Sequence, residues 1–412
     1  MPDLTSRNVL VNPSVALESQ MPDPQPAAPR RTPLTRVHEE LGATMTDFAG
    51  WQMPLRYRSE IAEHNAVRTA AGLFDLSHMG ELLVTGRDAA AALDYALVSE
   101  ISAIRQGRAK YTMISDADGG VIDDLIVYRL ADHDFLVVAN AANAATVAAE
   151  LTERAAGRAA VVEDRTQDYA LIAIQGPRSA GILATLTGTD LPSLKYYASY
   201  QATVAGRDVL LARTGYTGED GFEIFAAPDD APALWAALTE AGQDAGLIPA
   251  GLAARDSLRL EAGMPLYGNE LSRQITPYEA GLGRVVKLDK ASDFVGKAAL
   301  AAMAPKVPAR LLAGLVGQTR RIPRHGYTVL WEGKPSGTVT SGAHSPTLGR
   351  PIALAYLDAD AAGEAAAGAA RQAQQADDEG TTADGGLAID IRGSAEPVAL
   401  IKLPFYRRQE RA

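Results

Sequence analysis

The stretch GGVIDDLIVY, from Gly119 to Tyr128, decides how this chain is interpreted, because it places two adjacent carboxylates inside a run of β-forming residues. Aspartate is depleted in strand interiors, so its presence here needs a compensating reason. Side chains alternate between the two faces of a strand, and Asp123 and Asp124 must therefore point in opposite directions. Only one of them can serve a given site.

Asp124 is predicted to be the buried member of the pair. It shares a strand face with Ile122 and Ile126, whereas Asp123 shares its face with the charged Arg129. Asp123 is then a structural or solvated residue. A plainer interpretation is that an aspartate beside a double glycine is a solvated turn residue, and composition alone does not decide between the two.

The segment AKYTMIS, from Ala109 to Ser115, alternates like a partner strand, and the Gly- and Asp-containing segment after it favours a hairpin. We predict that Ile114 pairs with Val121, which places Tyr111 opposite Asp124 and within reach of a cross-strand contact. A slip of one residue would undo this register.

Composition limits the classes of function. A chain of 412 residues with 47% hydrophobic content predicts two or three domains with real cores. The net charge of −11 argues against broad attraction to nucleic acid or to an anionic membrane. The absence of cysteine excludes disulfides, thiolate metal sites and a cysteine nucleophile, and it favours the cytoplasm.

The N-terminal segment and the region after Pro305 differ in composition from the middle of the chain. The first 30 residues are rich in proline and carry acids, so they are predicted to be a disordered extension rather than a targeting signal. No apolar run is long enough to span a bilayer. After Pro305, short strands divided by Gly and Pro predict an all-β domain, interrupted at about 358–386 by a solvated or partly helical low-complexity insertion.

Two further polar residues accompany predicted strands. Asn140 lies at a strand-to-helix junction in FLVVANAAN (Phe135 to Asn143), where it is either an N-cap or a ligand-binding amide. The loop RTGYTGEDGFEI (Arg213 to Ile224) has three glycines within seven residues, and Glu223 lies in the strand that leaves it. Such loops bind ligands or serve as plain turns.

Basic and nucleophilic residues give weaker signals. Arg255 and Arg259 lie four residues apart on one helical face, as either a surface ladder paired with neighbouring acids or a clamp in which Arg255 binds a carboxylate. Adjacent Ser77 and His78 would point apart and are predicted to be structural. Walker, G-x-S-x-G and dinucleotide fingerprints are missing, and the six histidines lack metal-ligand spacing.

Eleven motifs follow one another along residues 31 to 407: RTPL, DFAGWQMPLRY, LFDLSHMGE, GGVIDDLIVY, VVANAAN, IQGP, RTGYTGEDGFE, GLAARDSLRLEAGMPLYG, DFVGKAAL, TSGAHSPTLG and KLPFYR. In this order they resemble the glycine cleavage T-protein family of aminomethyltransferases. The resemblance implies an α+β, three-domain folate-binding architecture, with two interleaved α+β domains over residues 31–304 and a C-terminal β-barrel over residues 305–412.

The resemblance also implies an activity. Enzymes of this family transfer the one-carbon unit from the aminomethyl-dihydrolipoyl arm of the lipoylated H protein to tetrahydrofolate, giving 5,10-methylenetetrahydrofolate and ammonia. Tetrahydrofolate is then a co-substrate, no metal is needed, and the chain is expected to be monomeric. Two alternatives remain: another folate-dependent one-carbon or methyl transferase of the family, or a non-catalytic folate-binding accessory protein, whose hallmark cysteine is missing here.

The family's essential acid falls on Asp124, the residue already selected by face alternation, and burial is expected to raise its pKa so that it can accept a proton. Glu223 would accept hydrogen bonds from the pterin, Tyr216 would be an aromatic wall, and Arg255 would bind the folate's glutamate tail. The residues that the resemblance assigns to folate binding are Met79, Tyr111, Asn140, Tyr216, Glu223 and Arg255.

Overall fold

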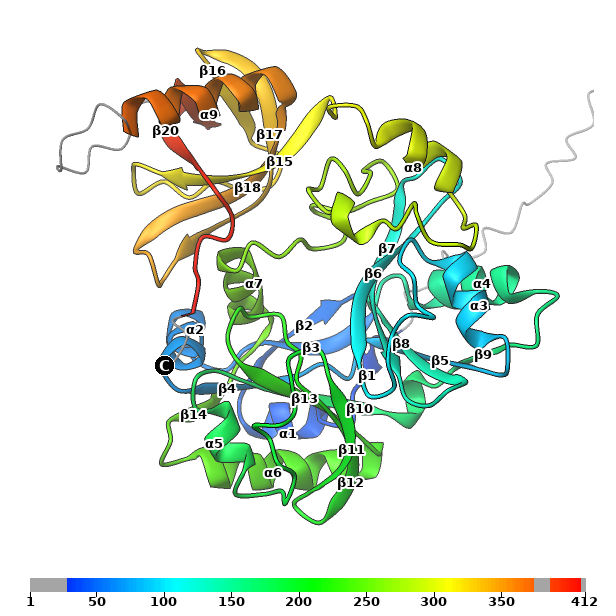
Figure 1. Ribbon diagram of the computed structural model, residues 1–412. Helices are drawn as coiled ribbons and strands as arrows, with labels where there is room; N and C mark the ends of the chain where they lie inside the picture. The colour runs from blue at the N-terminus through cyan, green and yellow to red at the C-terminus, as the bar shows by residue number, and fades with distance from the viewer. Residues whose placement is uncertain (1–27, 374–385, 409–412) are drawn as a thin grey trace, which may run out of the picture.

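The computed structural model describes residues 28–373 and 386–408, so most of the extension predicted over residues 1–30 lies outside the described residues. Figure 1 shows a β-barrel, a five-stranded sheet and a six-stranded sheet grouped around helix α7 (Leu252–Glu261). The predicted α+β class with a C-terminal barrel is therefore what the chain adopts. The division at residues 304 and 305 stays a prediction.

The stretch from Gly119 to Tyr128 and the segment before it fold, as predicted, into a β-hairpin of the five-stranded sheet. Its turn is closed by the Asp116 amide, which donates to the Gly120 carbonyl at 2.9 Å. Gly119 adopts a φ of +88°, which glycine tolerates without a steric penalty. The strands of this sheet, in spatial order, are β6 (Ala109–Ser115), β7 (Val121–Arg129), β8 (Asp134–Ala139), β5 (Gly80–Thr85) and β9 (Val161–Asp164).

The predicted register of the hairpin is wrong by two residues. Met113 rather than Tyr111 is the partner of Asp124, because the turn is tighter than expected and a bulge interrupts the pairing between Ile114 and Ser115. A shift of two residues keeps every side chain on its predicted face. Tyr111 therefore remains on the same face as Asp124, as its diagonal neighbour.

Asp123, rather than the predicted Asp124, is the more buried of the two aspartates. Asp123 is 0% exposed, whereas Asp124 is partly exposed. Leu125 and Val127, which share the Asp123 face, pack into a core with helices α3 (Ala89–Ala96) and α4 (Ala144–Ala155). These helices cover the face that the prediction had assigned to solvent because it carries Arg129.

The six-stranded sheet collects strands from distant parts of the chain. Consecutive strands β4 and β5 belong to different sheets, so the two α+β layers are interleaved. Helices α5 (Ser179–Leu183) and α6 (Ala231–Gly242) pack on one face of this sheet through a shared apolar core. The strands, in spatial order, are β11 (Ser199–Val204), β12 (Arg207–Ala212), β13 (Gly221–Ala226), β10 (Ala170–Gln175), β4 (Ala71–Asp75) and β14 (Leu247–Pro249).

Gly176, at the end of β10, should be intolerant of substitution. It has a φ of +133°, and an added Cβ would lie 2.6 Å from the Ala70 carbonyl oxygen. We expect Gly176→Ala to lower the free energy of unfolding by roughly 2–4 kcal/mol in urea denaturation, because backbone strain and overpacking both contribute. Gly181→Ala is the matched control, since its Cβ would meet nothing within 4 Å. Equal stabilities of the two variants would contradict the expectation.

The predicted all-β region is a closed six-stranded barrel. Helix α9 (Ala359–Ala373) follows β18, and Ala362 and Ala365 pack against the barrel. The predicted insertion is thus helical in its first part, and its residues 374–385 lie outside the described residues. The strands, in spatial order, are β15 (Arg310–Gly317), β18 (Arg350–Asp358), β17 (Lys334–Ser345), β16 (Thr328–Trp331), β19 (Leu387–Ile391) and β20 (Ser394–Ile401).

The remaining elements link these layers. Helix α2 (Glu60–Thr69) contacts α7, β4 and β14. The others are α1 (Thr35–Glu40), α8 (Lys297–Met303), the short 3-10 helices at Thr166–Asp168, Pro228–Asp230 and Gly283–Val285, and a small sheet of β1 (Arg30–Arg31), β3 (Trp51–Arg56) and β2 (Thr44–Phe48).

A buried carboxylate joins α2, α7 and the barrel. Glu261 accepts hydrogen bonds from Arg68 Nη2 at 2.9 Å and Thr347 Oγ1 at 2.7 Å, and it also contacts His64 and Ser345. Burial alone would raise the pKa of Glu261, but the hydrogen bond from His64, the Ser345 hydroxyl and the charge of Arg68 lower it to about 2. The carboxylate therefore stays ionised at the meeting point of three parts of the fold.

Candidate active site

Asp124 is held by donors from both neighbouring strands. The Tyr111 hydroxyl on β6 donates to Asp124 Oδ2 at 3.1 Å, and Asn140 Nδ2, just after β8, donates to Asp124 Oδ1 at 2.9 Å. The predicted Tyr111 contact is therefore present despite the different register. Each carboxylate oxygen has one protein donor, which leaves further acceptor capacity for a substrate.

Asn140 is not the N-cap of the following helix. The N-cap of α4 is Asn143, whose side chain makes no capping bond. Asn140 instead binds the acids: its Nδ2 also donates to Asp123 Oδ1 at 2.8 Å, and its backbone amide donates to Asp123 Oδ2 at 3.0 Å. Asn143 Nδ2 adds a bond to Asp123 Oδ1 at 2.7 Å. The two amides thus bind the acid pair from the β8–α4 junction.

Both aspartates are weak acids by the standard of exposed carboxyls. Burial raises the pKa of Asp124 to about 6, although the hydrogen bonds from Tyr111 and Asn140 act in the opposite direction. Burial and the nearby charge of Asp124 raise the pKa of Asp123 to about 7. The expectation that desolvation raises the pKa of Asp124 is therefore confirmed in direction, and neutral pH leaves it largely ionised.

Glu223 lies on β13 as predicted, in the six-stranded sheet. Its Oε2 accepts hydrogen bonds from the Thr214 hydroxyl and from the Tyr128 hydroxyl, the latter at 3.2 Å. Both bonds use Oε2, which leaves Oε1 able to accept from a ligand. Burial raises the pKa of Glu223. Tyr128 lies on β7, so the same strand supplies both Asp124 and a hydrogen-bond donor to Glu223.

The two arginines of α7, Arg255 and Arg259, have different surroundings: one pairs with acids and the other does not. Arg259 is buried and pairs with Asp256 at 2.7 Å and Glu270 at 2.9 Å. Arg255 has no carboxylate partner in residues 28–373 or 386–408, and its guanidinium lies 4.7 Å from the centroid of the Tyr216 ring. The predicted pairing with Asp256 is present for Arg259, but its predicted surface location is wrong because Arg259 is 1% exposed, whereas Arg255 keeps a planar fork available for an anion.

The predicted polar residues share one electrostatic neighbourhood. The charge of Asp124 contributes to raising the pKa values of Tyr111 and Tyr216, while Arg255 acts on Glu223 in the opposite direction. Met79 packs against the apolar core between the two sheets, which also contains Tyr128. Asp124 therefore lies near Tyr111 and Tyr216, and Arg255 lies near Glu223 and the Tyr216 ring.

Tyr197 is a buried residue near the acids that the sequence analysis did not single out. Its pKa is raised by burial, by the neighbouring Tyr196 and by the charges of Glu223 and Asp124, so it is near both acids. It has a φ of +59°, an uncommon conformation for a bulky residue and one that is often found at functional sites. The only sequence signal is the Tyr196–Tyr197 pair ahead of β11.

Ser77 and His78 do not form a catalytic pair. The Ser77 hydroxyl accepts a hydrogen bond from the Leu171 amide at 3.0 Å, which ties β10 to the loop between β4 and β5. His78 is buried, and burial with the nearby charge of Arg255 lowers its pKa to about 4. It is therefore neutral at physiological pH, in agreement with the predicted structural role.

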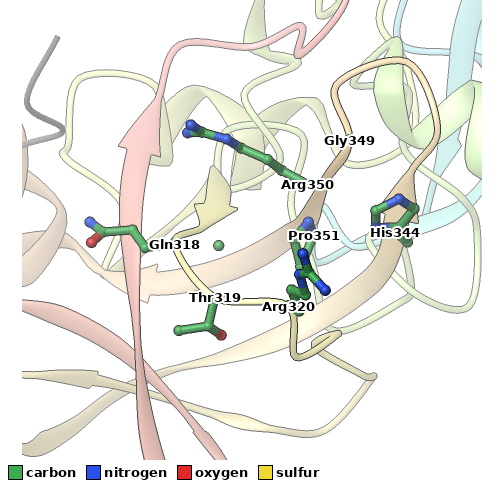
Figure 2. A pocket seen from close by; sticks show the side chains of 8 residues that line it. Gln318, Thr319, Arg320, His344, Gly349, Arg350 and Pro351 are labelled. Atoms are coloured by element: carbon green, nitrogen blue, oxygen red, sulfur yellow. The ribbon is translucent and has the colours of Figure 1, made fainter.

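A surface hollow of about 720 Å³ is lined by residues at the ends of the barrel strands β15, β17 and β18. Figure 2 shows that its lining includes the side chains of Arg320, His344 and Arg350, and none of the predicted site residues. Within the described ranges, no cluster of three His, Asp or Glu side chains could hold a metal ion. No helix there is long and apolar enough to cross a membrane.

Comparison with known proteins agrees with this architecture. A family model described as the GCVT N-terminal domain matches residues 34–290, and one described as the glycine cleavage T-protein C-terminal barrel domain matches residues 310–407. The chain belongs to the glycine cleavage T-protein family. The resemblance predicted from the motifs is confirmed.

Individual T-protein relatives are similar over nearly their whole length. An aminomethyltransferase of Saccharopolyspora erythraea is 61% identical over 383 residues, which cover 93% of the chain and 99% of the relative. One of Bacillus subtilis is 43% identical over 380 residues, with 92% and 99% covered. These relatives confirm the prediction of an aminomethyltransferase of the glycine cleavage system.

A solved T-protein structure supports the fold assignment. The crystal structure of glycine cleavage system aminomethyltransferase T from Bartonella henselae matches with a TM-score of 0.80 and 36% identity, covering 92% of this chain and 98% of that one. The predicted three-part α+β and β-barrel class is therefore confirmed.

Proposed function

We propose that the chain moves the aminomethyl carbon from the dihydrolipoyl arm of the H protein to tetrahydrofolate. Two C–N bonds to the folate form, while the C–S bond to the lipoyl arm and the C–N bond to the leaving amine break. The two protons lost by the folate nitrogens go to the sulfur and to ammonia, so no oxidant is needed. The observation that carries this proposal is the Asp124 carboxylate, held by Tyr111 and Asn140 on the same strand that supplies the Tyr128 hydroxyl to Glu223.

The donor set fits tetrahydrofolate as the co-substrate. Oε1 of Glu223 can accept from the N–H groups of a pterin, and the Tyr216 ring offers an apolar face to a flat heterocycle. The Arg255 guanidinium suits the carboxylates of the glutamate tail. Met79 adds an adaptable apolar contact at the core between the sheets.

Asp124 is proposed as the acid–base group of the transfer. Its carboxylate would orient the anilinic nitrogen of the folate and take its proton as that nitrogen attacks the carbon leaving sulfur. A pKa of about 6 keeps the carboxylate ionised at neutral pH while bringing it close enough to neutrality to exchange a proton. Tyr111 and Asn140 hold both oxygens, so the base is oriented before the substrate arrives.

The remaining partner and location assignments stay predictions. These are the lipoylated H protein as donor, the absence of nucleic-acid and membrane partners, a metal-free reaction, a monomeric state and a place in the cytoplasm. The non-catalytic accessory role is not favoured for a chain so similar to aminomethyltransferases.

Turnover tests the proposal directly. Mixing the protein with tetrahydrofolate and aminomethylated H protein should release ammonia and form 5,10-methylenetetrahydrofolate in equal amounts. Folate binding without ammonia release would point to the accessory role. Transfer from a methylated amine, with none from the H protein, would point to another one-carbon transferase of the family.

Tyr111→Phe should move the acid limb of the pH dependence of kcat/KM upward by about one pH unit. The lost hydrogen bond favours the ionised form of Asp124, so its removal raises that pKa further. The measurement is kcat/KM from about pH 5 to 9. Tyr57→Phe is the matched control, because its hydroxyl contacts His38 instead. A limb that does not move would mean that another group titrates.

A further inference from the structure

Asp123 has more hydrogen bonds than the acid assigned to the chemistry. It is 0% exposed, it faces away from the site, and it accepts three bonds from the β8–α4 junction at 2.7, 2.8 and 3.0 Å. Uncompensated burial of a carboxylate is expensive. The three hydrogen bonds compensate for the burial of the Asp123 carboxylate, and Asn140 donates two of them.

The Asn140 amide connects the two aspartates. Its Nδ2 lies 2.8 Å from Asp123 Oδ1, 2.9 Å from Asp124 Oδ1 and 3.2 Å from the Asp124 carbonyl oxygen, so its two hydrogens are shared among three acceptors, and the two carboxylates are the nearest of them. A flipped amide would place its oxygen against both acids, which accept but do not donate when ionised. The bond from the Asn140 backbone amide to Asp123 Oδ2 fixes the same residue a second time. Asp123 thereby determines which end of the amide meets Asp124.

We propose that Asp123 is a positioning residue of the transfer, which acts through Asn140 to hold the Asp124 carboxylate in one orientation toward the substrate. This inference rests on the proposed function and deepens it. Asp123 touches no reacting atom, because it lies on the opposite face of β7. Its removal should therefore affect the rate of the chemical step much more than the binding of folate.

Asp123→Asn is the direct test. The asparagine can still accept from one amide, but its own NH2 group replaces the oxygen that meets the Asn140 backbone N–H, so one bond becomes a clash of donors. We expect kcat to fall by about 10- to 100-fold, while the Kd for tetrahydrofolate changes by less than about threefold. If the effect passes through Asn140, the double variant with Asn140→Ala should be no slower than Asn140→Ala alone.

Asp94→Asn is the matched control. Asp94 is also buried and accepts two backbone amides, from Ile101 and Ser102, but it lies on α3 away from the site. Asp94→Asn should lower the free energy of unfolding about as much as Asp123→Asn does, and it should leave kcat unchanged. If Asp123→Asn does not fold, Asn143→Ala replaces it, since Asn143 donates to Asp123 rather than to Asp124 and its removal loosens Asp123 alone. It should lower kcat more than it weakens folate binding, and an unchanged kcat would count against the positioning role.

The outcomes separate this inference from the proposed function. Active wild-type protein together with a folded Asp123→Asn variant of normal kcat would overturn the positioning role alone. Rate losses that multiply in the double variant would also overturn it, because Asp123 would then act independently of Asn140. Wild-type protein that releases no ammonia would overturn both.

Discussion

Asp124→Asn is expected to lower kcat by about 10²- to 10⁴-fold while the Kd for tetrahydrofolate changes by less than about threefold, because a general base is lost without a change in side-chain size. The folded protein should still bind folate through Glu223, Tyr216 and Arg255. The measurements are single-turnover ammonia release for the rate and equilibrium titration for folate affinity.

The pH dependence adds a second readout for the same variant. Wild-type turnover should fall as the pH drops below about 6, where the Asp124 carboxylate takes up a proton, and this limb should be missing from the residual activity of the variant. Asp134→Asn, at the start of β8 in the same sheet, is the control and should retain both the rate and the limb. Near-normal transfer by Asp124→Asn would refute the proposed role.

Glu261→Gln is expected to lower the free energy of unfolding by roughly 3 kcal/mol at neutral pH, because the buried Arg68 keeps Glu219 but loses its second carboxylate, and the new amide places donors where Ser345 and Thr347 donate. The side chain of Glu261 is 0% exposed and that of Arg68 is 5% exposed. Removing one partner of a buried pair costs more than the pair contributes. Urea denaturation at neutral pH measures the loss, and Glu39→Gln, in an exposed pair with Arg31, is the control.

The destabilisation should depend on pH in a defined direction. The folded-state pKa of Glu261 is lowered to about 2, so its ionised form stabilises the fold above the ordinary glutamate value and this contribution disappears as the pH falls toward 2. The difference between wild type and variant should accordingly shrink on acidification. A difference that stays constant from neutral pH to about pH 3 would show that packing, not charge, is responsible.

The sequence was most informative for features that the alternation of side chains along a single strand determines. Face alternation in GGVIDDLIVY separated Asp123 from Asp124 and pointed to the residue now placed beside Tyr111. It could not show which face the helices cover, because α3 and α4 are distant in sequence and their packing is a tertiary property. The hairpin register failed for a related reason, since a bulge changes the residue count without a clear signature in side-chain type.

Longer-range features were still less accessible. The bonds from Asn140 to both acids exist because β8 lies next to β7, and no periodicity within either strand encodes that proximity. Arg255 and Arg259 look alike on a helical wheel, and only the positions of Glu270 and Tyr216 tell them apart. Tyr197 acquires its place from a left-handed backbone that its sequence context does not require.

The interior position of β4 has a consequence for synthesis on the ribosome. This strand is bordered on one edge by β10 and on the other by β14, so its second edge stays open until Pro249 has been added. At about 5–20 residues per second, the nascent chain carries this apolar strand for roughly 10–30 s before its last partner is made. The N-terminal quarter of the chain must therefore wait in an unfinished state, in which holding chaperones can bind it.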